Sequence, residues 1–429
     1  MTALQRLLGT STLSSFRRPG FGWLWVALAL NGFTHSVATV AYGWLALEIT
    51  GSPVAVGTVF AVRYVPRLLF GVPSGALSDR MDRRRMLQGV ALLGGLVTLG
   101  TAGLGLTGNL TFTVLLVVAF LEGSFDTVET TLGRALVYDL VGRAEAVNGM
   151  ALEQLGSRGI GAVGSVAAGV LFAWYGSAAT FLSMAISYAA AVALLSRVPR
   201  GLRAPAHDDA SVLEDRTANA GKQRRSVGNV AAVLQGFAVL WRSPAVLLLA
   251  AIGAAAEVFA FSSDALLSSF ARNILEIGPT GLGNLIAVRQ VAGAAGLLAL
   301  AALSTRVRPA KLLFWMCGMF SLSLIAFAGS GSYSLSLLLM LGIGVAWSAI
   351  DVLLPKLFQD SVPDGERGAA VGIWNLSRGA GPLGNLETGA VAGAIGAPLA
   401  QGINAAVLLV VVAAAAWLQR FPRWRISSD

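Results

Sequence analysis

The chain has 429 residues, of which 55% are hydrophobic and only 12% are charged, and its mean hydropathy is +0.71. This composition excludes an ordinary soluble domain and is typical of a protein with several membrane-spanning helices. The formal net charge is +9, so the positions of the basic residues must decide between a basic face for nucleic acid and the loops of a membrane protein.

Twelve apolar stretches follow one another along the chain, most of them close to the roughly 20 residues that a helix needs to cross a bilayer. In chain order they are 21–47, 54–77, 87–106, 111–132, 147–173, 177–195, 245–269, 279–303, 312–328, 333–354, 369–395 and 397–417. The first follows Arg17 and Arg18, but it is too long for the apolar part of a signal peptide and is interpreted as a retained span. The pattern predicts an all-α membrane protein with twelve transmembrane helices.

The longest polar run lies between the sixth and seventh stretches, from Arg197 to Arg242, and it has no sustained apolar period. Such a run predicts a linker that is partly disordered. We therefore divide the chain into an N-terminal six-helix bundle (1–196), a linker (197–243) and a C-terminal six-helix bundle (244–429).

The basic residues gather in alternate loops. One side takes both termini, the arginine-rich segment 80–85, the linker and most other Lys and Arg residues, whereas the opposite loops hold only Arg272. The positive-inside rule then predicts a multi-pass protein of the cell membrane whose termini and linker are cytoplasmic. Because topology accounts for the charge of +9, we expect the lipid bilayer, and not nucleic acid, as the partner of this basic chain.

The two halves repeat each other. Arg63 and Arg158, both inside apolar stretches, recur as Arg289 and Arg378, at offsets of 289 − 63 = 226 and 378 − 158 = 220. An arginine within the membrane is costly, so its recurrence in register indicates an internal duplication rather than coincidence. Two pseudo-symmetric bundles joined by a linker are typical of a transporter that rocks around a substrate site near the midplane.

The loop between the second and third spans reads GALSDRMDRRRML at positions 75–87. It resembles the signature loop of the major facilitator superfamily, and Thr50, Arg63 and Arg67 lie in segments that are similar to its drug- and siderophore-exporting branch. The resemblance covers essentially the whole chain and implies a major facilitator fold. We expect a monomer.

The resemblance also assigns roles within this loop. It implies a close-packing glycine, a loop carboxylate and three basic positions that lock a cytoplasmic gate: Gly75, Asp79, Arg80, Arg83 and Arg84. A carboxylate among arginines at helix ends can pair across the interface between bundles. The alternative is that these arginines only anchor the topology.

The fourth span carries three carboxylates. Glu122, Asp126 and Glu129 fall within a narrow arc of one helix face at about 100° per residue. They cannot all stay ionised in a low dielectric, so at least one is expected to exchange protons with a water-filled cavity. We expect Asp126, the middle one, to couple to protons or another cation, whereas Glu129 is alternatively solvated or paired with Arg134.

Further ionisable or polar residues lie on other spans: Asn31 and His35 on the first, Glu257 and Asp264 on the seventh, and Asp351 on the tenth. The carboxylates can bind a cationic substrate, relay protons, or neutralise the four arginines within the spans, and the sequence does not choose among these roles. His35 can titrate near neutral pH or be a satisfied core residue.

The sequence predicts a secondary transporter that exports a hydrophobic or amphipathic small molecule, such as a drug, antibiotic or siderophore, by proton antiport. No phosphate-binding glycine loop is present, so ATP is not the expected energy source. A single cysteine and two histidines, with no cluster, also predict no metal and no cofactor. The alternatives are a proton-coupled uptake symporter or lipid or metabolite transporter of the same fold and, at lower weight, an intramembrane hydrolase. We expect the chain not to be an enzyme.

Overall fold

The computed structural model describes residues 14–78, 82–142, 145–199, 242–303, 307–363 and 366–421, with the single positions 240, 424 and 426. Asp79 and Arg80 of the predicted gate lie outside these ranges, as does nearly all of the predicted linker. The described residues form helices and connecting turns, with no strand among them.

The N-terminal half contains η1 (Ser14–Arg17), α2 (Phe21–Thr50), α3 (Pro53–Ser78), α4 (Arg83–Leu106), α5 (Phe112–Val141) and α6 (Ala146–Leu195). The 50-residue α6 comprises two spans, because its backbone leaves helical geometry at Gly176, where φ is 74° and ψ is −170°. Glycine adopts this positive φ without a Cβ clash, so the chain can reverse here. The end of α6 returns to the start of α4, where Arg84 donates a hydrogen bond to the Ser196 carbonyl.

The C-terminal half contains α9 (Pro244–Phe259), η2 (Phe261–Ser263), α10 (Asp264–Ser269), η3 (Phe270–Ile274), α11 (Gly278–Leu303), α12 (Pro309–Ala328), α13 (Tyr333–Asp360), α14 (Arg367–Arg378), α15 (Gly381–Ile395) and α16 (Ala397–Leu418). The predicted seventh span is interrupted at η2, and the eleventh is broken between α14 and α15. Pro382 follows the second break directly, where its missing N–H suits the first turn of α15.

The prediction of twelve spans is confirmed. Within the described ranges, nine helical segments are long and apolar enough to cross a membrane, and α6, which crosses twice, counts once among them. The other two predicted spans are α5, which carries charges along its length, and the broken pair α14 and α15.

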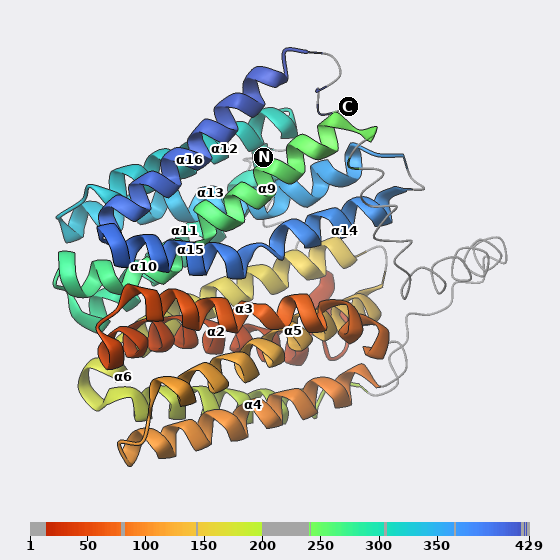
Figure 1. Ribbon diagram of the computed structural model, residues 1–429. Helices are drawn as coiled ribbons and strands as arrows, with labels where there is room; N and C mark the ends of the chain where they lie inside the picture. Colours follow the sequence, from red (N-terminus) through yellow and green to blue (C-terminus); the bar gives the residue numbers. More distant parts are fainter. Residues whose placement is uncertain are drawn as a thin grey trace.

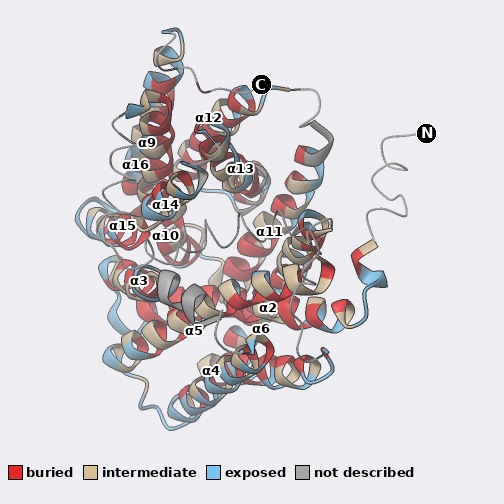
Figure 2. Ribbon diagram, turned by 90° about the vertical axis from the view of Figure 1, so that its right-hand side faces the viewer, coloured by how far each residue is buried: buried red, intermediate tan, exposed pale blue. Residues whose placement is uncertain are grey.

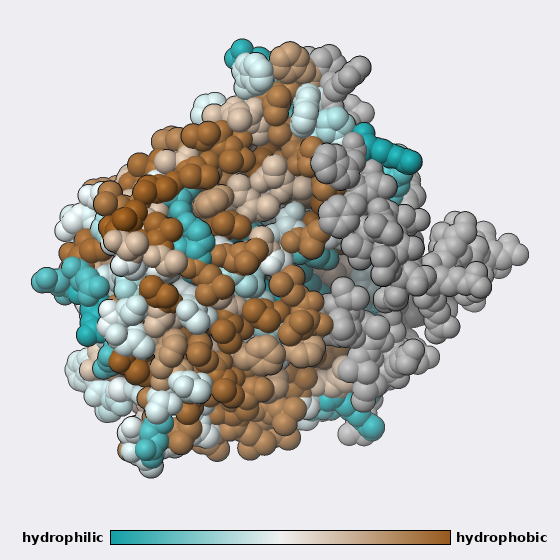
Figure 3. Space-filling model, viewed as in Figure 1, coloured by the Kyte–Doolittle hydropathy of each residue, from teal (hydrophilic) through white to brown (hydrophobic). Residues whose placement is uncertain are grey.

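The two halves lie side by side as separate bundles. Figure 1 shows the N-terminal half, red to yellow, below the C-terminal half, green to blue. Figures 1 and 2 show α3 beside α15, and Figure 2 shows α2 and α6 beside α11. Apolar side chains cover most of the face in Figure 3, as a surface in contact with lipid requires.

The halves approach each other closely at the end away from the linker. A Cβ atom on Gly57 of α3 would lie 2.8 Å from the Cα of Gly389 in α15, and one on Gly283 of α11 would lie 3.2 Å from the Cα of Gly169 in α6. At the same end, Arg272 donates a 2.9 Å hydrogen bond to the Leu47 carbonyl. The two glycine crossings are related by the sequence repeat, so the duplication also repeats this contact between the halves.

Candidate functional site

A cavity of about 180 Å³ lies among α2, α3, α5 and α6 and reaches the C-terminal half at Gln290 of α11. Its polar and charged lining residues are Asn31, His35, Ser36, Arg67, Asp126, Glu129, Thr130, Arg134, Glu153, Gln154, Ser157 and Gln290. Four of the residues predicted from the sequence, Asn31, His35, Asp126 and Glu129, therefore line one space. A polar cavity inside an apolar bundle is the expected place for ligand binding in a membrane protein.

Asp126 lies between two cationic or titratable partners. Its Oδ2 atom is 3.4 Å from Nη2 of Arg67, which comes from α3, and its Oδ1 atom is 3.4 Å from Nδ1 of His35, which comes from α2. The Asp126 side chain is only 18% exposed, whereas those of His35 and Arg67 are 34% and 37% exposed. Both contacts are long for charge-assisted hydrogen bonds, so water or a ligand can compete for this carboxylate.

His35 faces two groups with opposite requirements. Its Nδ1 atom is 3.2 Å from Nη2 of Arg63 and 3.4 Å from the Asp126 carboxylate. Without a proton, Nδ1 accepts a hydrogen bond from Arg63, but with a proton it donates to Asp126 and has no lone pair for the arginine. One proton on this ring atom therefore decides whether His35 bonds to α3 or to α5.

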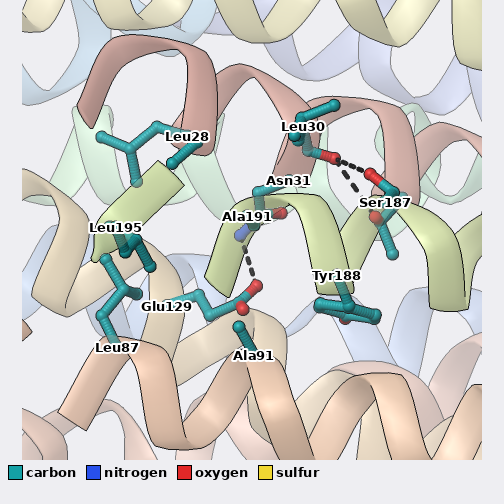
Figure 4. Close-up of a pocket in the computed structure, with 12 residues that line it drawn as sticks. Leu28, Leu30, Asn31, Leu87, Ala91, Glu129, Ser187, Tyr188, Ala191 and Leu195 are labelled. Atoms are coloured by element: carbon teal, nitrogen blue, oxygen red, sulfur yellow. Dashed lines mark hydrogen bonds between the residues drawn. The ribbon is translucent and has the colours of Figure 1, made fainter. Parts of the chain in front are cut away.

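Glu129 and Glu122 are more deeply buried than Asp126. Glu129 is 4% exposed and accepts a 2.6 Å hydrogen bond from the Asn31 amide, as Figure 4 shows. Its described partner is therefore Asn31 and not Arg134, whose side chain is exposed. The side chain packs beside Tyr188 at a second cavity of about 10 Å³, the lower limit for one water molecule. Glu122, 3% exposed, accepts a 3.1 Å hydrogen bond from the Tyr188 hydroxyl.

In the C-terminal half each predicted carboxylate contacts an arginine, and two of the three share Arg378. Asp264 pairs with both terminal nitrogens of Arg289. Arg378 donates to Glu257 at 3.2 Å and lies 3.5 Å from Asp351. Of the three roles left open by the sequence, these contacts correspond to the neutralisation of arginine.

The other two predicted arginines have no carboxylate partner among the described contacts. Arg63 donates to Thr39 at 3.3 Å and to His35, and its guanidinium lies 5.6 Å from the centre of the Tyr42 ring. Arg158 lies against Gly293 of the opposite half, where its Nη1 is 2.8 Å from the position that a Cβ would take. Its Nε is buried without a hydrogen-bond partner in the described chain.

The described part of the predicted gate contacts its own half. Gly75 lies near the end of α3. Arg83 pairs with Asp139 of α5 at 2.6 Å, and Arg84 bonds to the end of α6. The loop residue Asp82 caps α4 by accepting from the backbone of Arg84 at 3.0 Å. These contacts fix α4 against α5 and α6, and none of them crosses to the C-terminal half.

Several residues of the site were not singled out from the sequence as part of it. Arg67 lies one helical turn after Arg63 in the same span, so its periodicity could have indicated it. Gln290 follows Arg289 directly and donates a 2.6 Å hydrogen bond across the halves to Ser36. Tyr188 and Asp139 have no distinguishing local pattern, because their importance comes from the helices they face.

Two pseudo-symmetric six-helix bundles, with a charged cavity that reaches from the first bundle to the second, are typical of a membrane transporter. The family model of the Major Facilitator Superfamily matches residues 24–384, and the chain belongs to this family. It is accordingly a multi-pass transporter of small molecules and not an enzyme. Transporters of this family are typically monomeric.

Among curated proteins, the chain is similar to the staphyloferrin A transporter of Staphylococcus aureus (strain NCTC 8325 / PS 47), with 30% identity over 159 residues. This match covers 37% of the chain and spans 40% of the length of that relative.

Solved structures share the fold. A bacterial homologue of the human lysosomal transporter Spinster, inward-facing and unoccupied, has a TM-score of 0.71 at 15% identity. The match covers 92% of this chain and 95% of the chain of that homologue. A POT family transporter in complex with 5-aminolevulinic acid has a TM-score of 0.69 at 12% identity, with coverage of 94% and 96%.

Proposed function

We propose that this transporter exports a hydrophobic or amphipathic small molecule, of the drug, antibiotic or siderophore kind, in exchange for protons. The observation that carries the proposal is the position of His35, whose Nδ1 lies between Arg63 and Asp126 at the wall of the 180 Å³ cavity. The partial similarity to a siderophore transporter supports the choice of substrate class.

The coupling step follows from the donors and acceptors in this group. A proton on Nδ1 of His35 ends its hydrogen bond from Arg63 and directs the ring to Asp126. A proton on Asp126 removes the negative charge that holds Arg67. Either event changes which helices are tied together, so proton binding and substrate binding compete through the same contacts.

The proposed orientation makes this cavity accessible from the cytoplasm. We place both termini and the linker (197–243) on the cytoplasmic side of the cell membrane, with the N-terminal bundle at 1–196 and the C-terminal bundle at 244–429. The glycine crossings between the halves then lie at the outer end. An exporter in this state collects substrate from inside the cell.

The test is transport by the purified protein in proteoliposomes, with ethidium and staphyloferrin A as probes and an imposed pH gradient. We expect proton-driven extrusion that falls to the passive rate when an ionophore collapses the gradient. Extrusion that is unchanged after collapse contradicts antiport, and proton-driven accumulation in the opposite direction assigns uptake instead. Glu48→Gln, which changes an exposed carboxylate at the end of α2, is the control for a nonspecific effect of charge.

A further inference from the structure

A second polar cluster lies in the C-terminal half, where η2, α15 and α16 meet. It consists of Glu387 and Thr388 of α15, Asn404 of α16 and Ser262 of η2. Thr388, Asn404 and Ser262 are each at most 2% exposed, and Glu387 is partly buried. None of these residues lines the 180 Å³ cavity of the candidate site.

Hydrogen bonds connect this cluster to the interruption in the seventh span. The Thr388 hydroxyl lies 3.2 Å from Oε2 of Glu387, and the Ser262 hydroxyl lies 2.9 Å from that of Thr388. Ser262 then donates at 2.6 Å to the carbonyl of Val258. That carbonyl lies at the end of α9, where the regular helix gives way to η2.

The number of protons in these contacts differs between protonated and ionised Glu387. Three oxygen-to-oxygen hydrogen bonds join Glu387, Thr388, Ser262 and the Val258 carbonyl, and each needs one proton. The two hydroxyl groups supply only two. Ser262 uses its proton on Val258, and Thr388 can donate either to Glu387 or to Ser262, but not to both.

Asn404 does not supply the missing proton. Its amide nitrogen lies 3.0 Å from Oε2 of Glu387 and 3.0 Å from the Thr388 hydroxyl, so its two hydrogens serve two other contacts. All the contacts are satisfied together when Glu387 itself carries a proton and donates it to Thr388.

We propose that Glu387 is a second proton-binding carboxyl of this transporter, separate from the Asp126 site, and that its proton completes the hydrogen-bond chain to the break in the seventh span. The protonation itself does not depend on the proposed export function. Only the use of this proton in transport rests on that function.

The charged surroundings agree with a neutral Glu387. No ion pair of Glu387 is formed within the described chain, and α16 carries no titratable side chain in its described length. The other elements packed against α15 have charged residues that already have partners. Glu257 of α9 is paired with Arg378, and Asp264 of α10 is paired with Arg289. Arg63 and Arg67 of α3 bond within the N-terminal half, beside Tyr64. An acid without a cationic partner inside a membrane is expected to be protonated or to contact water.

Loss of this proton has a defined structural consequence. With Glu387 ionised, Thr388 turns its hydroxyl to the carboxylate, and the 2.9 Å contact with Ser262 loses its hydrogen. That contact ties α15 to η2, so deprotonation loosens α15 from the broken part of the seventh span. Glu387 precedes the end of α15 by eight residues, about 12 Å along the helix axis.

Infrared difference spectroscopy of the purified full-length transporter during a pH titration tests the proposal without any substrate. We expect a protonated-carboxyl band in the wild type that is lost in Glu387→Gln, which keeps the shape of the side chain. Glu48→Gln, at the exposed end of α2, is the matched control and should retain the band. If the wild type and Glu387→Gln give the same carboxyl bands, Glu387 does not exchange a proton in this titration and the proposal is wrong.

A second pair of variants tests the hydrogen-bond chain through Thr388 rather than the protonation of Glu387. Thr388→Val removes the middle hydroxyl at nearly constant volume and should move the Glu387 band to higher frequency, whereas Thr388→Ser should leave it in place. A band that does not move in Thr388→Val shows that Glu387 does not donate to Thr388 and overturns the inferred chain. Failure of proton-driven export in liposomes, with this band present, would reject the proposed function but not the proton site.

Discussion

The two halves repeat the same backbone contact but surround it with different charges. Gly123 of α5 packs against the Arg63 carbonyl, and Gly344 of α13 packs against the Arg289 carbonyl, each so closely that a Cβ would clash. These glycines therefore mark equivalent points on equivalent helices. The arginine and the glycine are present in both halves, and the glycine is required because close packing at this crossing tolerates no side chain.

At this alignment, with an offset of 344 − 123 = 221, the acidic face of α5 has an apolar counterpart. Glu122, Asp126 and Glu129 correspond to Ile343, Trp347 and Ile350 of α13. The Trp347 ring lies 4.7 Å from the Arg289 guanidinium and stacks on Phe261, with ring centres 4.4 Å apart.

The arginines are balanced differently as a result. Arg289 has a carboxylate, Asp264, and an aromatic ring, whereas Arg63 has the neutral or titratable partners Thr39, Tyr42 and His35. The C-terminal half therefore holds its central charge in a fixed pair, and the N-terminal half leaves its charge open to a change in protonation. Of the two repeated arginines, only Arg63 therefore has a titratable group, His35, as its hydrogen-bond partner.

The largest expected effect is the loss of stability in Asp264→Asn. The Asp264 and Arg289 side chains are only 10% and 12% exposed, so removing the carboxylate leaves a buried guanidinium without its counter-charge. Breaking such a pair costs about 3–5 kcal/mol. Thermal unfolding in detergent should show a clear fall in Tm, and the double variant Asp264→Asn with Arg289→Gln should recover part of it. An unchanged Tm contradicts the fixed pair.

Asp126→Asn should affect coupling more than stability. Its partners are partly exposed and its contacts are 3.4 Å long, so water replaces the lost charge more easily than at Asp264. Coupling free energies between sites are about 1–3 kcal/mol, so gradient-driven efflux should fall roughly 5- to 150-fold while downhill exchange remains. Proton release on ethidium binding, followed with a pH dye, should fall with it. If both are unchanged, the proton site lies elsewhere.

The sequence predicted the spans, the repeat and the acidic face of α5, because each depends on the pattern within one segment. It did not predict the partners. Glu129 bonds to Asn31 and not to Arg134, although Arg134 is nearer in the chain, because tertiary packing places α2 against that face. His35 is similar: its type indicated titration, but only the packing of α2 against α3 and α5 places Nδ1 between a donor and an acceptor.

Gly57→Ala should have an intermediate effect: it should lower the population of the state in which the two halves are in contact at Gly57. The added Cβ lies 2.8 Å from the Cα of Gly389, so the halves must separate at this end to admit it. Overpacking costs about 1–3 kcal/mol, and the closed contact should be less populated to that extent.

The measurement is maleimide labelling of Ser36→Cys from the end away from the linker, in a Cys317→Ser background, because Cys317 is the only cysteine. Gly57→Ala should increase the labelling rate. Gly89→Ala, where an added Cβ has nothing within 4 Å, should leave it unchanged. Equal rates in the two variants would show that the glycine crossing does not control access.

The smallest effect is expected for Glu129→Gln. Its side chain is 4% exposed and accepts from the Asn31 amide at 2.6 Å, and a glutamine carbonyl at the same place accepts the same bond. If Glu129 contributes packing and this bond, transport and Tm should change little, within about 0.5 kcal/mol. Asn31→Leu, which leaves the buried carboxyl without its donor, should cost about 1–3 kcal/mol. A loss of proton-driven efflux in Glu129→Gln as large as in Asp126→Asn would extend the proton site to the whole acidic face of α5 and sharpen its contrast with the apolar face of α13.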